Sequence, residues 1–443
     1  MQSPGRPEGE QEALARQAIG DCPLFIKAVT TLADKREVLA SEDIYASGGM
    51  KLVSRGTRLS GSFYDHLVAH KLLKPIEQSL NVADALNSRK LVSLVHEKAH
   101  LVPSLKPLID QPELLERLGG LFNELKIPAP LALRLTVMQE EQPALFEHSL
   151  MSSVIATVLG VRGNLAREEL QALALASIFH DIGELYIDPD FLAQEHQMTM
   201  DERRYLYVHP ITGFLMLRDF PELPKETANA VLQHHERLDG TGYPYRLSGH
   251  RITTVSRYLA VAEVAASLFV KYGADRRIGM KFRMNTKKYD ANAVTIISRL
   301  FDSSLLQTGP KPDEALLMTR LAQVSKLFET WAELKNNLSE ADVEAMSFLV
   351  ERMNSLRSLV LEPGYDECRL EDALTLSGQA DPEIYMELMV LLDELNWQFK
   401  ALSRGVERDL SVWGVQIPGR HKYGLDDWLA QVRLFVADEP VFA

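Results

Sequence analysis

The sequence predicts a mainly α-helical protein with a small mixed α/β module near its N-terminus and a helical extension at its C-terminus. Between residues 42 and 59, short apolar runs flank Gly48-Gly49, a pattern typical of a β-hairpin. From residue 127 onward, helical segments follow one another and are separated by glycine and proline. A chain of 443 residues is also too long for one ordinary core, so we expect several domains.

Four segments are expected along the chain. Residues 1–20 begin with polar residues and prolines, which indicates a flexible N-terminus, and residues 21–126 are interpreted as the small mixed module. Residues 127–306 are expected to form a helical domain that carries the chemistry. Residues 307–443 are expected to form a helical C-terminal domain of unknown role.

Local signals predict where some helices begin and end. Thr199 and Glu202 form a capping box, which predicts the start of a helix that leads to His209. Pro210 follows directly and is expected to break this helix or to begin a new first turn, because proline has no backbone N–H.

The C-terminal extension is interpreted as a core-packing helical bundle. A capping box at Ser339 and Asp342 precedes an apolar stripe at helical spacing. Asp381 before Pro382 predicts the start of a second helix with one apolar face. We identify no catalytic pattern here, and the apolar faces would serve a homodimer as easily as a core.

The composition indicates the class of protein and its compartment. Apolar residues make up 46% and charged residues 25%, which is typical of a globular chain. No apolar stretch reaches the ~18–20 residues that a membrane span needs. The two cysteines, Cys22 and Cys368, suggest no disulfide framework, and the polar N-terminus has no hydrophobic signal core. We therefore expect a cytoplasmic protein without a membrane span.

The net charge limits the partners. At −13 it disfavours binding to DNA, which depends on neutralising phosphates. A small phosphate ester remains possible, because bound metal ions can reverse the local potential.

Histidines concentrate in one part of the chain. Six of the twelve lie between His148 and His235. His180-Asp181 ends an otherwise apolar run, so we expect these two polar side chains to be buried. One histidine alone is usually a core residue. Each buried imidazole needs its own hydrogen-bond partner, however, so five histidines together with carboxylates predict a metal site. Nitrogen and carboxylate ligands without thiolate suit iron, manganese or zinc.

Glu263 is a second indication of a metal. It is the only charged residue between Arg257 and Lys271, on an apolar helical segment. A carboxylate there needs a cation or a strong donor, or it must stay protonated. A metal is the expected partner, and a buried salt bridge is the alternative.

These residues resemble the HD-GYP branch of the HD superfamily. The run from His234 to Pro244 reads His-His-Glu-Arg-Leu-Asp-Gly-Thr-Gly-Tyr-Pro, which is the full motif of that branch. The earlier motif residues stand in the order of the family, and they are His148, His180, Asp181, His209 and Pro210. The resemblance covers about residues 130–300 and implies a helical, HD-type, metal-dependent domain of bacterial signalling. More weakly, the N-terminal block is similar to the small module that often precedes such domains.

The resemblance implies a site and a reaction. Two divalent ions are implied, with iron or manganese favoured and zinc possible, held by His148, His180, Asp181, His209, His234, His235 and Glu263. Asp181 would bridge the two ions and would be the catalytic residue. The two ions together would lower the pKa of a water molecule that bridges them, which gives hydroxide. The implied substrate is cyclic di-GMP, opened to pGpG and in some members to GMP. The implied substrate-binding residues are Glu184, Asp239, Gly242, Tyr243 and Pro244.

Three features depart from the family: the residues at 184 and 263, and the absence of the Arg-Pro-Tyr-Arg-like text that normally follows just downstream, where Asp275-Arg276-Arg277 does not align. Glu184 replaces a lysine that meets the substrate phosphate, and this change of charge would cost about 1–3 kcal/mol of transition-state stabilisation. Glu263 replaces an aspartate. Ala144 stands where three-metal members have glutamate, so we expect two metals at most.

These departures leave several functions open. The first is a cyclic di-GMP phosphodiesterase with weakened activity. The second is a catalytically degenerate nucleotide sensor or a scaffold that binds a signalling protein. The third is a phosphohydrolase for another nucleotide.

Two other histidine pairs are set aside. His96 and His100 match the His-Glu-x-x-His pattern of zinc proteases, but no third ligand follows at a suitable spacing, so we expect an exposed helix. His66 and His70 are also one helical turn apart and are interpreted as surface or packing residues.

Overall fold

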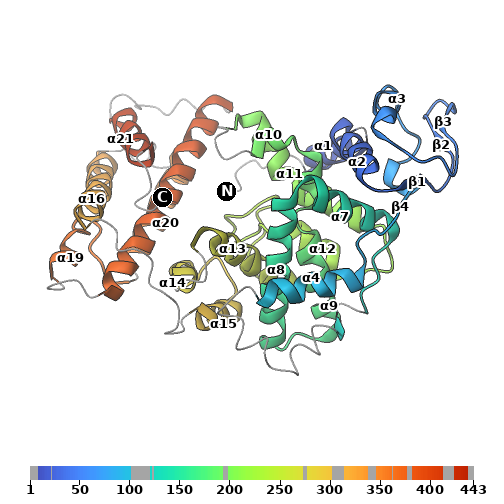
Figure 1. Ribbon diagram of the computed structural model, residues 1–443. Coiled ribbons are helices and arrows are strands. Elements are labelled where there is room, and N and C mark those ends of the chain that lie inside the picture. Colours follow the sequence, from blue (N-terminus) through green and yellow to red (C-terminus); the bar gives the residue numbers. More distant parts are fainter. Residues whose placement is uncertain are drawn as a thin grey trace. The chain divides into compact units, whose positions relative to one another are not determined.

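The structure is a computed structural model. It describes residues 8–20, 22–100, 120–121, 124–192, 198–272, 277–301, 314–337, 346–361, 363–376, 382–412 and 424–437. Figure 1 shows many helices and a few short strands in these ranges, which confirms the mainly helical fold class. The chain divides into two compact units: Met1–Ala274 with Thr286–Ser303, and Asp275–Asn285 with Ser304–Ala443. The two units do not test the bounds of the four expected segments, which stay predictions.

The N-terminal part of the first unit is mixed, as predicted. Two antiparallel pairs of strands are formed, β1 (Val38–Ala40) with β4 (Leu80–Val82) and β2 (Ile44–Tyr45) with β3 (Lys51–Val53). Gly49 lies in the β2–β3 turn at a φ of +83°, a conformation that favours glycine. The accompanying helices are α2 (Pro23–Lys35), η1 (Gly61–Phe63), α3 (Tyr64–Val68), η2 (Ile76–Ser79) and α4 (Ser88–His100).

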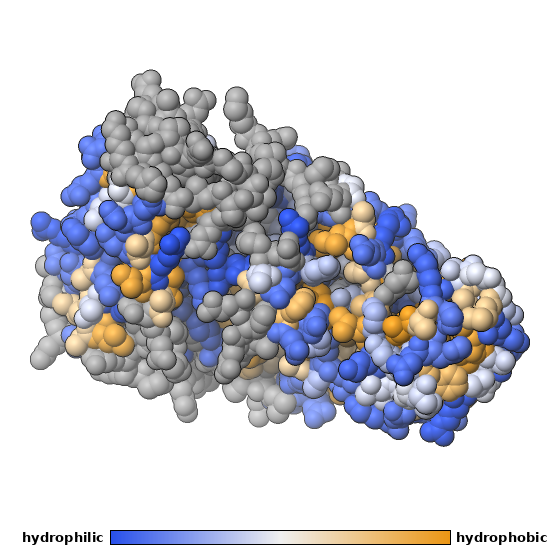
Figure 2. Space-filling model, turned by 90° about the horizontal axis from the view of Figure 1, so that it is seen from above, coloured by the Kyte–Doolittle hydropathy of each residue, from blue (hydrophilic) through white to orange (hydrophobic). Residues whose placement is uncertain are grey.

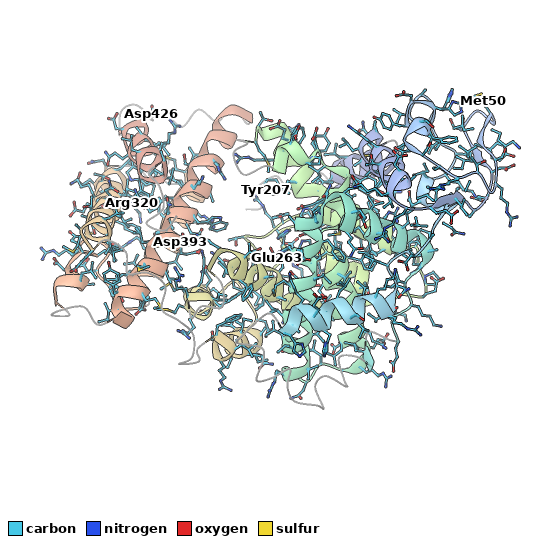
Figure 3. All side chains as sticks on the ribbon, viewed as in Figure 1. Met50, Tyr207, Glu263, Arg320, Asp393 and Asp426 are labelled. Carbon is cyan, nitrogen blue, oxygen red and sulfur yellow. The ribbon has the colours of Figure 1, made fainter. Side chains whose placement is uncertain are left out.

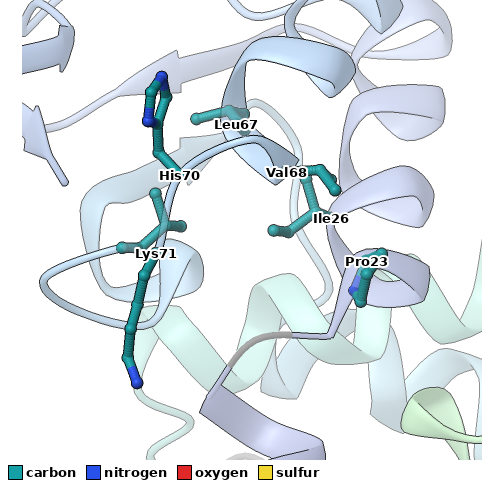
Figure 4. A pocket seen from close by; sticks show the side chains of 7 residues that line it. Pro23, Ile26, Leu67, Val68, His70 and Lys71 are labelled. Carbon is teal, nitrogen blue, oxygen red and sulfur yellow. The ribbon is translucent and has the colours of Figure 1, made fainter. Parts of the chain in front are cut away.

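A small hollow lies in this module beside α2 and α3 (Figure 4). Its volume is about 160 Å³, and its lining residues are Pro23, Ile26, Leu67, Val68, His70, Lys71 and Leu72. The predicted metal ligands are not among these residues, so this hollow is separate from the predicted site.

The larger part of the first unit is a helical assembly. Its elements are α7 (Ala129–Glu141), α8 (Pro143–Arg162), α9 (Arg167–Phe179), η3 (Ile182–Tyr186), α10 (Pro189–Leu192), α11 (Met200–Leu217), α12 (Glu226–Gln233), η4 (Gly249–Arg251), α13 (Thr254–Tyr272) and α15 (Ala291–Phe301). Helix α8 packs against both α9 and α13. Within the described ranges it is the one helix long and apolar enough to cross a membrane, and 72% of its apolar window is buried inside the protein. Its apolar surface is therefore used in packing.

Helix α11 both confirms and corrects the local predictions. Thr199 caps its start and forms the predicted capping box with Glu202. The predicted break at Pro210 is wrong, because α11 continues through this residue to Leu217. Proline removes one helical hydrogen bond, that of the carbonyl four residues earlier. Here the carbonyl of Leu206 instead accepts a hydrogen bond from the imidazole of His209, at 2.6 Å.

The N-terminus also differs from expectation. Residues 1–20 are expected to be flexible, whereas α1 (Glu8–Gly20) is a helix that packs against α11. Ala15 of α1 is buried with Ile211 and Leu215 of α11. The apolar stripe of α1 is small and becomes a packing surface only when α11 is present. Because the segment is mostly polar in composition, the helix could not be predicted from its sequence.

The second unit is helical, as predicted. It contains α14 (Arg277–Met284), α16 (Glu314–Asn336), α18 (Ser347–Leu361), α19 (Asp372–Leu376), α20 (Pro382–Val412) and α21 (Leu425–Ala437). Its core includes Trp331 and Trp428, whose ring centroids lie 5.1 Å apart. Helix α20 begins at Pro382 as predicted, while Ser339, Asp342 and Asp381 lie outside the described residues.

Apolar and polar residues are interspersed on the molecular surface. The face in Figure 2 shows orange apolar residues scattered among blue polar ones. Because much of any protein surface is apolar, a single exposed apolar residue needs no functional explanation.

Candidate metal centre

Six of the seven predicted metal ligands come from four helices and the turns that follow them. His148 lies within α8 and His209 within α11, whereas the other four histidine and aspartate ligands come directly after helices. His180 and Asp181 follow α9, and His234 and His235 follow α12.

Two groups of potential ligand atoms share one residue. Asp181 belongs to a group with His148 and His180, and to a second group with His209, His234 and His235. Within each group, the ligand atoms all lie within 4.8 Å of one another. The structure therefore brings six of the seven predicted metal ligands together, and this His/Asp cluster can bind metal.

The carboxylate of Asp181 faces both groups. Its Oδ2 lies 2.9 Å from Nε2 of His180 and 3.8 Å from Nε2 of His148. Its Oδ1 lies 3.2 Å from Nε2 of His209 and 3.4 Å from Nε2 of His234. One oxygen thus serves each group, which is the arrangement that a bridging carboxylate needs.

Three of the imidazoles are held in the same way. In each, Nδ1 donates to the backbone carbonyl three residues earlier, and the pairs are His180 with Ser177 at 2.9 Å, His209 with Leu206 at 2.6 Å, and His234 with Val231 at 2.6 Å. A carbonyl only accepts, so the hydrogen-bond network assigns the proton to Nδ1. When a ring is neutral, as it must be to bind a metal, its Nε2 lone pair is then directed to the cluster.

These carbonyls are available for a structural reason. His180 and His234 are the C-cap residues of α9 and α12, where the last carbonyls of a helix have no helical partner. In α11 the same condition arises in mid-helix, because Pro210 has no N–H to donate to Leu206. The backbone thus supplies each of these histidines with an acceptor that the helix itself does not use.

The donor set fits a divalent cation. His209 and His234 place their Nε2 atoms 3.2 Å apart, so two lone pairs face each other when both rings carry their proton on Nδ1. Nε2 of His180 is buried and has no hydrogen-bond partner, despite its short distance to Asp181. A cation relieves both the lone-pair contact and the unpaired buried atom, and imidazole with carboxylate suits iron, manganese or zinc.

The metal-free cluster has strongly perturbed electrostatics. Burial lowers the pKa of His148 and of His234 to about 4 each. Burial alone would also lower the pKa of His180, but the Asp181 carboxylate outweighs it and raises that pKa to about 9. For Asp181 itself, burial opposes ionisation, and the neighbouring imidazoles nevertheless hold its pKa well below the usual range.

Glu263, the seventh predicted ligand, is near the cluster without joining it. It lies on α13 (labelled in Figure 3) and is buried, and its Oε2 has no hydrogen-bond partner. It is outside the two groups of ligand atoms. Burial raises its pKa, while the positive charge of Arg237 opposes this rise. Its role as a ligand stays a prediction.

The loop after His235 folds back on its own start. A Cβ on Gly242 would lie 2.4 Å from Cα of Glu236, so only glycine fits. The buried carboxylate of Glu236 accepts from the backbone N–H groups of Tyr245 at 2.7 Å and Leu247 at 2.9 Å. Glu236 therefore holds the loop, a role that the sequence pattern alone did not reveal.

Other predicted substrate-binding residues lie in this loop. Tyr243 stacks on the ring of His235, with centroids 4.5 Å apart and an interplanar angle of 23°. Pro244 follows it and is half-buried. Asp239 is exposed, and its Oδ1 accepts from the N–H of Thr241 at 3.0 Å and from its hydroxyl at 2.6 Å. In the structure, Asp239 stabilises the turn.

Comparison with known proteins agrees with this geometry. The family model described as HD domain matches residues 135–289, and the branch motif from His234 to Pro244 lies inside that segment. Residues 135–289 are similar to HD domains, and the run from His234 to Pro244 within them carries the residues of the HD-GYP motif. This similarity covers the metal cluster and the loop that follows it.

Several curated relatives are similar to part of this chain. Cyclic di-GMP phosphodiesterase PA4108 of Pseudomonas aeruginosa is 30% identical over 119 residues, which is 27% of this chain and 29% of that protein. The response regulator RpfG of Xanthomonas campestris pv. campestris, named a cyclic di-GMP phosphodiesterase, is 33% identical over 121 residues, 27% of this chain and 31% of RpfG. The chain thus spans less than a third of these two relatives.

Two further matches extend beyond this segment. The 3'3'-cGAMP-specific phosphodiesterase 1 of Vibrio cholerae is 25% identical over 247 residues, covering 55% of this chain and 53% of that protein. Among solved structures, Bd1817, described as a HDG"Y"P protein from Bdellovibrio bacteriovorus, matches 61% of this chain and 95% of its own at 13% identity, with a TM-score of 0.33.

Glu184 lies beside the HD-GYP cluster. A Cβ on Gly183 would lie 2.2 Å from the backbone oxygen of His209, so η3 approaches α11 backbone to backbone. This close approach puts Oε1 of Glu184 3.9 Å from Nδ1 of His209. Burial, with a further contribution from the charge of Asp181, raises the pKa of Glu184 to about 7 in the metal-free protein.

A buried polar network connects the N-terminal module to the site. Arg134 on α7 forms a buried ion pair with Glu77 of η2, and its Nε donates to the hydroxyl of Tyr186 at 3.3 Å. Tyr186 ends η3, the element that begins just after Asp181, and Phe25 of α2 stacks on its ring at 5.0 Å. This network was not predicted from the sequence, although Arg134 is the only charged residue in the apolar first three turns of α7.

The histidine pairs that were set aside lie elsewhere. His96 and His100 are exposed near the end of α4, as predicted. His66 and His70 contact each other edge to face, with centroids 5.5 Å apart. Neither pair belongs to a potential ligand group among the described residues.

Proposed function

We propose that this chain is a metal-dependent phosphodiesterase that opens cyclic di-GMP to linear pGpG. The observation that carries the proposal is the pair of ligand groups that share Asp181 within an HD-GYP segment. The names of the relatives, which are cyclic di-GMP and 3'3'-cGAMP phosphodiesterases, support this class of substrate.

The proposal gives each ligand a role. One divalent ion would be held by His148, His180 and Asp181, with Glu263 completing its shell, and a second by Asp181, His209, His234 and His235. Such ions, with iron or manganese preferred, polarise a phosphoryl oxygen and lower the pKa of bound water.

The residues of the chain position these groups. The backbone carbonyls that bind Nδ1 of His180, His209 and His234 fix the imidazole planes. Asp181 remains anionic and places one oxygen toward each ligand group. Tyr243 covers the outer face of the ring of His235.

The direct test is an assay of purified protein of known metal content. Under reducing conditions, manganese- or iron-loaded protein should convert cyclic di-GMP to pGpG, and 3'3'-cGAMP should be assayed in parallel. His234→Ala should lower metal affinity by at least ~10–100-fold, since even the loss of an outer-shell partner has that effect. His96→Ala, which removes an exposed histidine of α4, is the matched control. Bound metal without product at any loading would overturn the proposal.

Glu184 favours a second candidate, a catalytically degenerate nucleotide sensor or protein-interaction scaffold. Its carboxyl stands close to His209, where the family has a lysine that attracts the substrate phosphate. If this residue weakens an active enzyme, Glu184→Lys should raise the rate of cyclic di-GMP cleavage. A sensor would bind the nucleotide without cleaving it in both forms.

A further inference from the structure

A short series of aromatic rings leads outward from the metal cluster. The ring of His235 stacks on Tyr243, and Tyr243 contacts Tyr207 edge to face, with centroids 4.8 Å apart and an interplanar angle of 74°. Tyr207 lies on α11, two residues before His209 (Figure 3). The ring of Tyr207 is thus connected to a candidate metal ligand through one intervening ring.

Tyr207 is exposed although the residues that follow it on α11 are buried. It is 46% exposed, while its neighbours Val208 and His209 are buried. An exposed tyrosine is ordinary by itself. Here, however, Tyr243 restrains the ring of Tyr207 beside the candidate site, and a restrained aromatic ring offers contact area at low entropic cost.

The chemistry of the proposed substrate suits such a ring. Every nucleobase has a flat π-face, and one base stacked on an aromatic side chain contributes ~1–3 kcal/mol. In a nucleotide the base is one ribose away from the phosphate, so a base can reach a ring beside the metals that bind the phosphate. Stacking is uncharged, so the carboxyl of Glu184, which disfavours phosphate, does not oppose it.

We propose that Tyr207 is the stacking platform for a nucleobase of the bound substrate. This inference rests on the proposed function and deepens it, because it names the part of the substrate that the protein recognises outside the metals. Tyr207 selects nucleotide phosphodiesters over phosphate esters without a base, and Tyr243 positions its ring.

The test measures binding to metal-loaded protein by calorimetry, with pGpG and ribose 5-phosphate as probes. Tyr207→Ala should weaken the binding of pGpG about tenfold, which is ~1.4 kcal/mol, and should leave ribose 5-phosphate unchanged. Tyr207→Trp should retain or strengthen the binding of pGpG because it keeps a stacking face. The matched control is Tyr205→Ala, which removes another exposed tyrosine of α11 that is 42% exposed.

The outcomes separate this inference from the proposed function. If wild-type protein binds pGpG in the predicted way but does not cleave cyclic di-GMP, the phosphodiesterase proposal fails and the stacking platform stands. Equal effects of Tyr207→Ala and Tyr205→Ala, or equal loss of pGpG and ribose 5-phosphate, would overturn the platform. Failure of wild-type protein to bind pGpG would overturn it as well.

Discussion

Removing Glu77 should strongly destabilise the first unit. The side chains of Glu77 and Arg134 are 2% and 5% exposed, so Glu77→Ala leaves a guanidinium buried without its counter-ion. Breaking a buried pair in this way costs ~3–5 kcal/mol. This is a large part of the ~5–15 kcal/mol by which a typical protein is stable. The hydroxyl of Tyr186 remains near Arg134 but is only a neutral partner.

A matched control is present on α7, the helix that carries Arg134. Glu141 of α7 pairs with Lys35 of α2 at 2.8 Å, but this pair is partly exposed, and such pairs contribute ~0–1 kcal/mol. Urea unfolding followed by far-UV circular dichroism should therefore show a much lower midpoint for Glu77→Ala than for Glu141→Ala. Replacing both Glu77 and Arg134 with Met should restore much of the loss.

The same experiment tests the connection to the metal centre. Because Tyr186 ends the element that follows Asp181, Glu77→Ala should also weaken metal binding, whereas Glu141→Ala should not. Equal midpoints and equal metal affinities for the two variants would refute the reasoning.

Three further predictions concern the ligands. Pro210→Ala supplies a backbone N–H that competes with His209 for its carbonyl, so metal affinity should fall ~10-fold without loss of folding stability; unchanged affinity would contradict this. The metal-free protein holds a proton on His180 below pH ~9, because Asp181 raises that pKa to about 9. Metal binding at pH 7.5 should therefore release at least one proton, because the pKa of His209 is raised as well. Affinity should rise with pH up to the pKa of His180, and calorimetric enthalpies identical in all buffers would argue against this reasoning. Gly183→Ala would put a Cβ 2.2 Å from a backbone oxygen and should abolish metal binding, whereas Gly48→Ala, which meets nothing within 4 Å, should bind normally.

The sequence predicted the site best where ionisable side chains stand in otherwise apolar segments. His180-Asp181 at the end of an apolar run and the eleven residues from His234 identified four of the six cluster members, because buried imidazoles and carboxylates are rare without partners. The order of the family motif added His148 and His209. Their pairing could not be predicted in detail. Which oxygen of Asp181 faces which group depends on where α8, α9, α11 and α12 pack, and sequence spacing does not contain that information.

The wrong prediction at Pro210 has a physical lesson. The rule that proline breaks a helix considers only the backbone, and it leaves out a side chain that takes the freed carbonyl. The pair of Arg134 with Glu77 was missed for a related reason. The two residues are 57 positions apart, and a partner so distant in sequence is visible only once the chain is folded.

The three carbonyl-bound imidazoles have a consequence for the entropy of metal uptake. Fixing a mobile side chain during binding costs ~0.5–1.5 kcal/mol each. His180, His209 and His234 are already ordered by bonds to their own helices, so this loss of rotamer freedom occurs when the chain folds. The ion then encounters ligands that are already in place, and less of its binding free energy is consumed in ordering them.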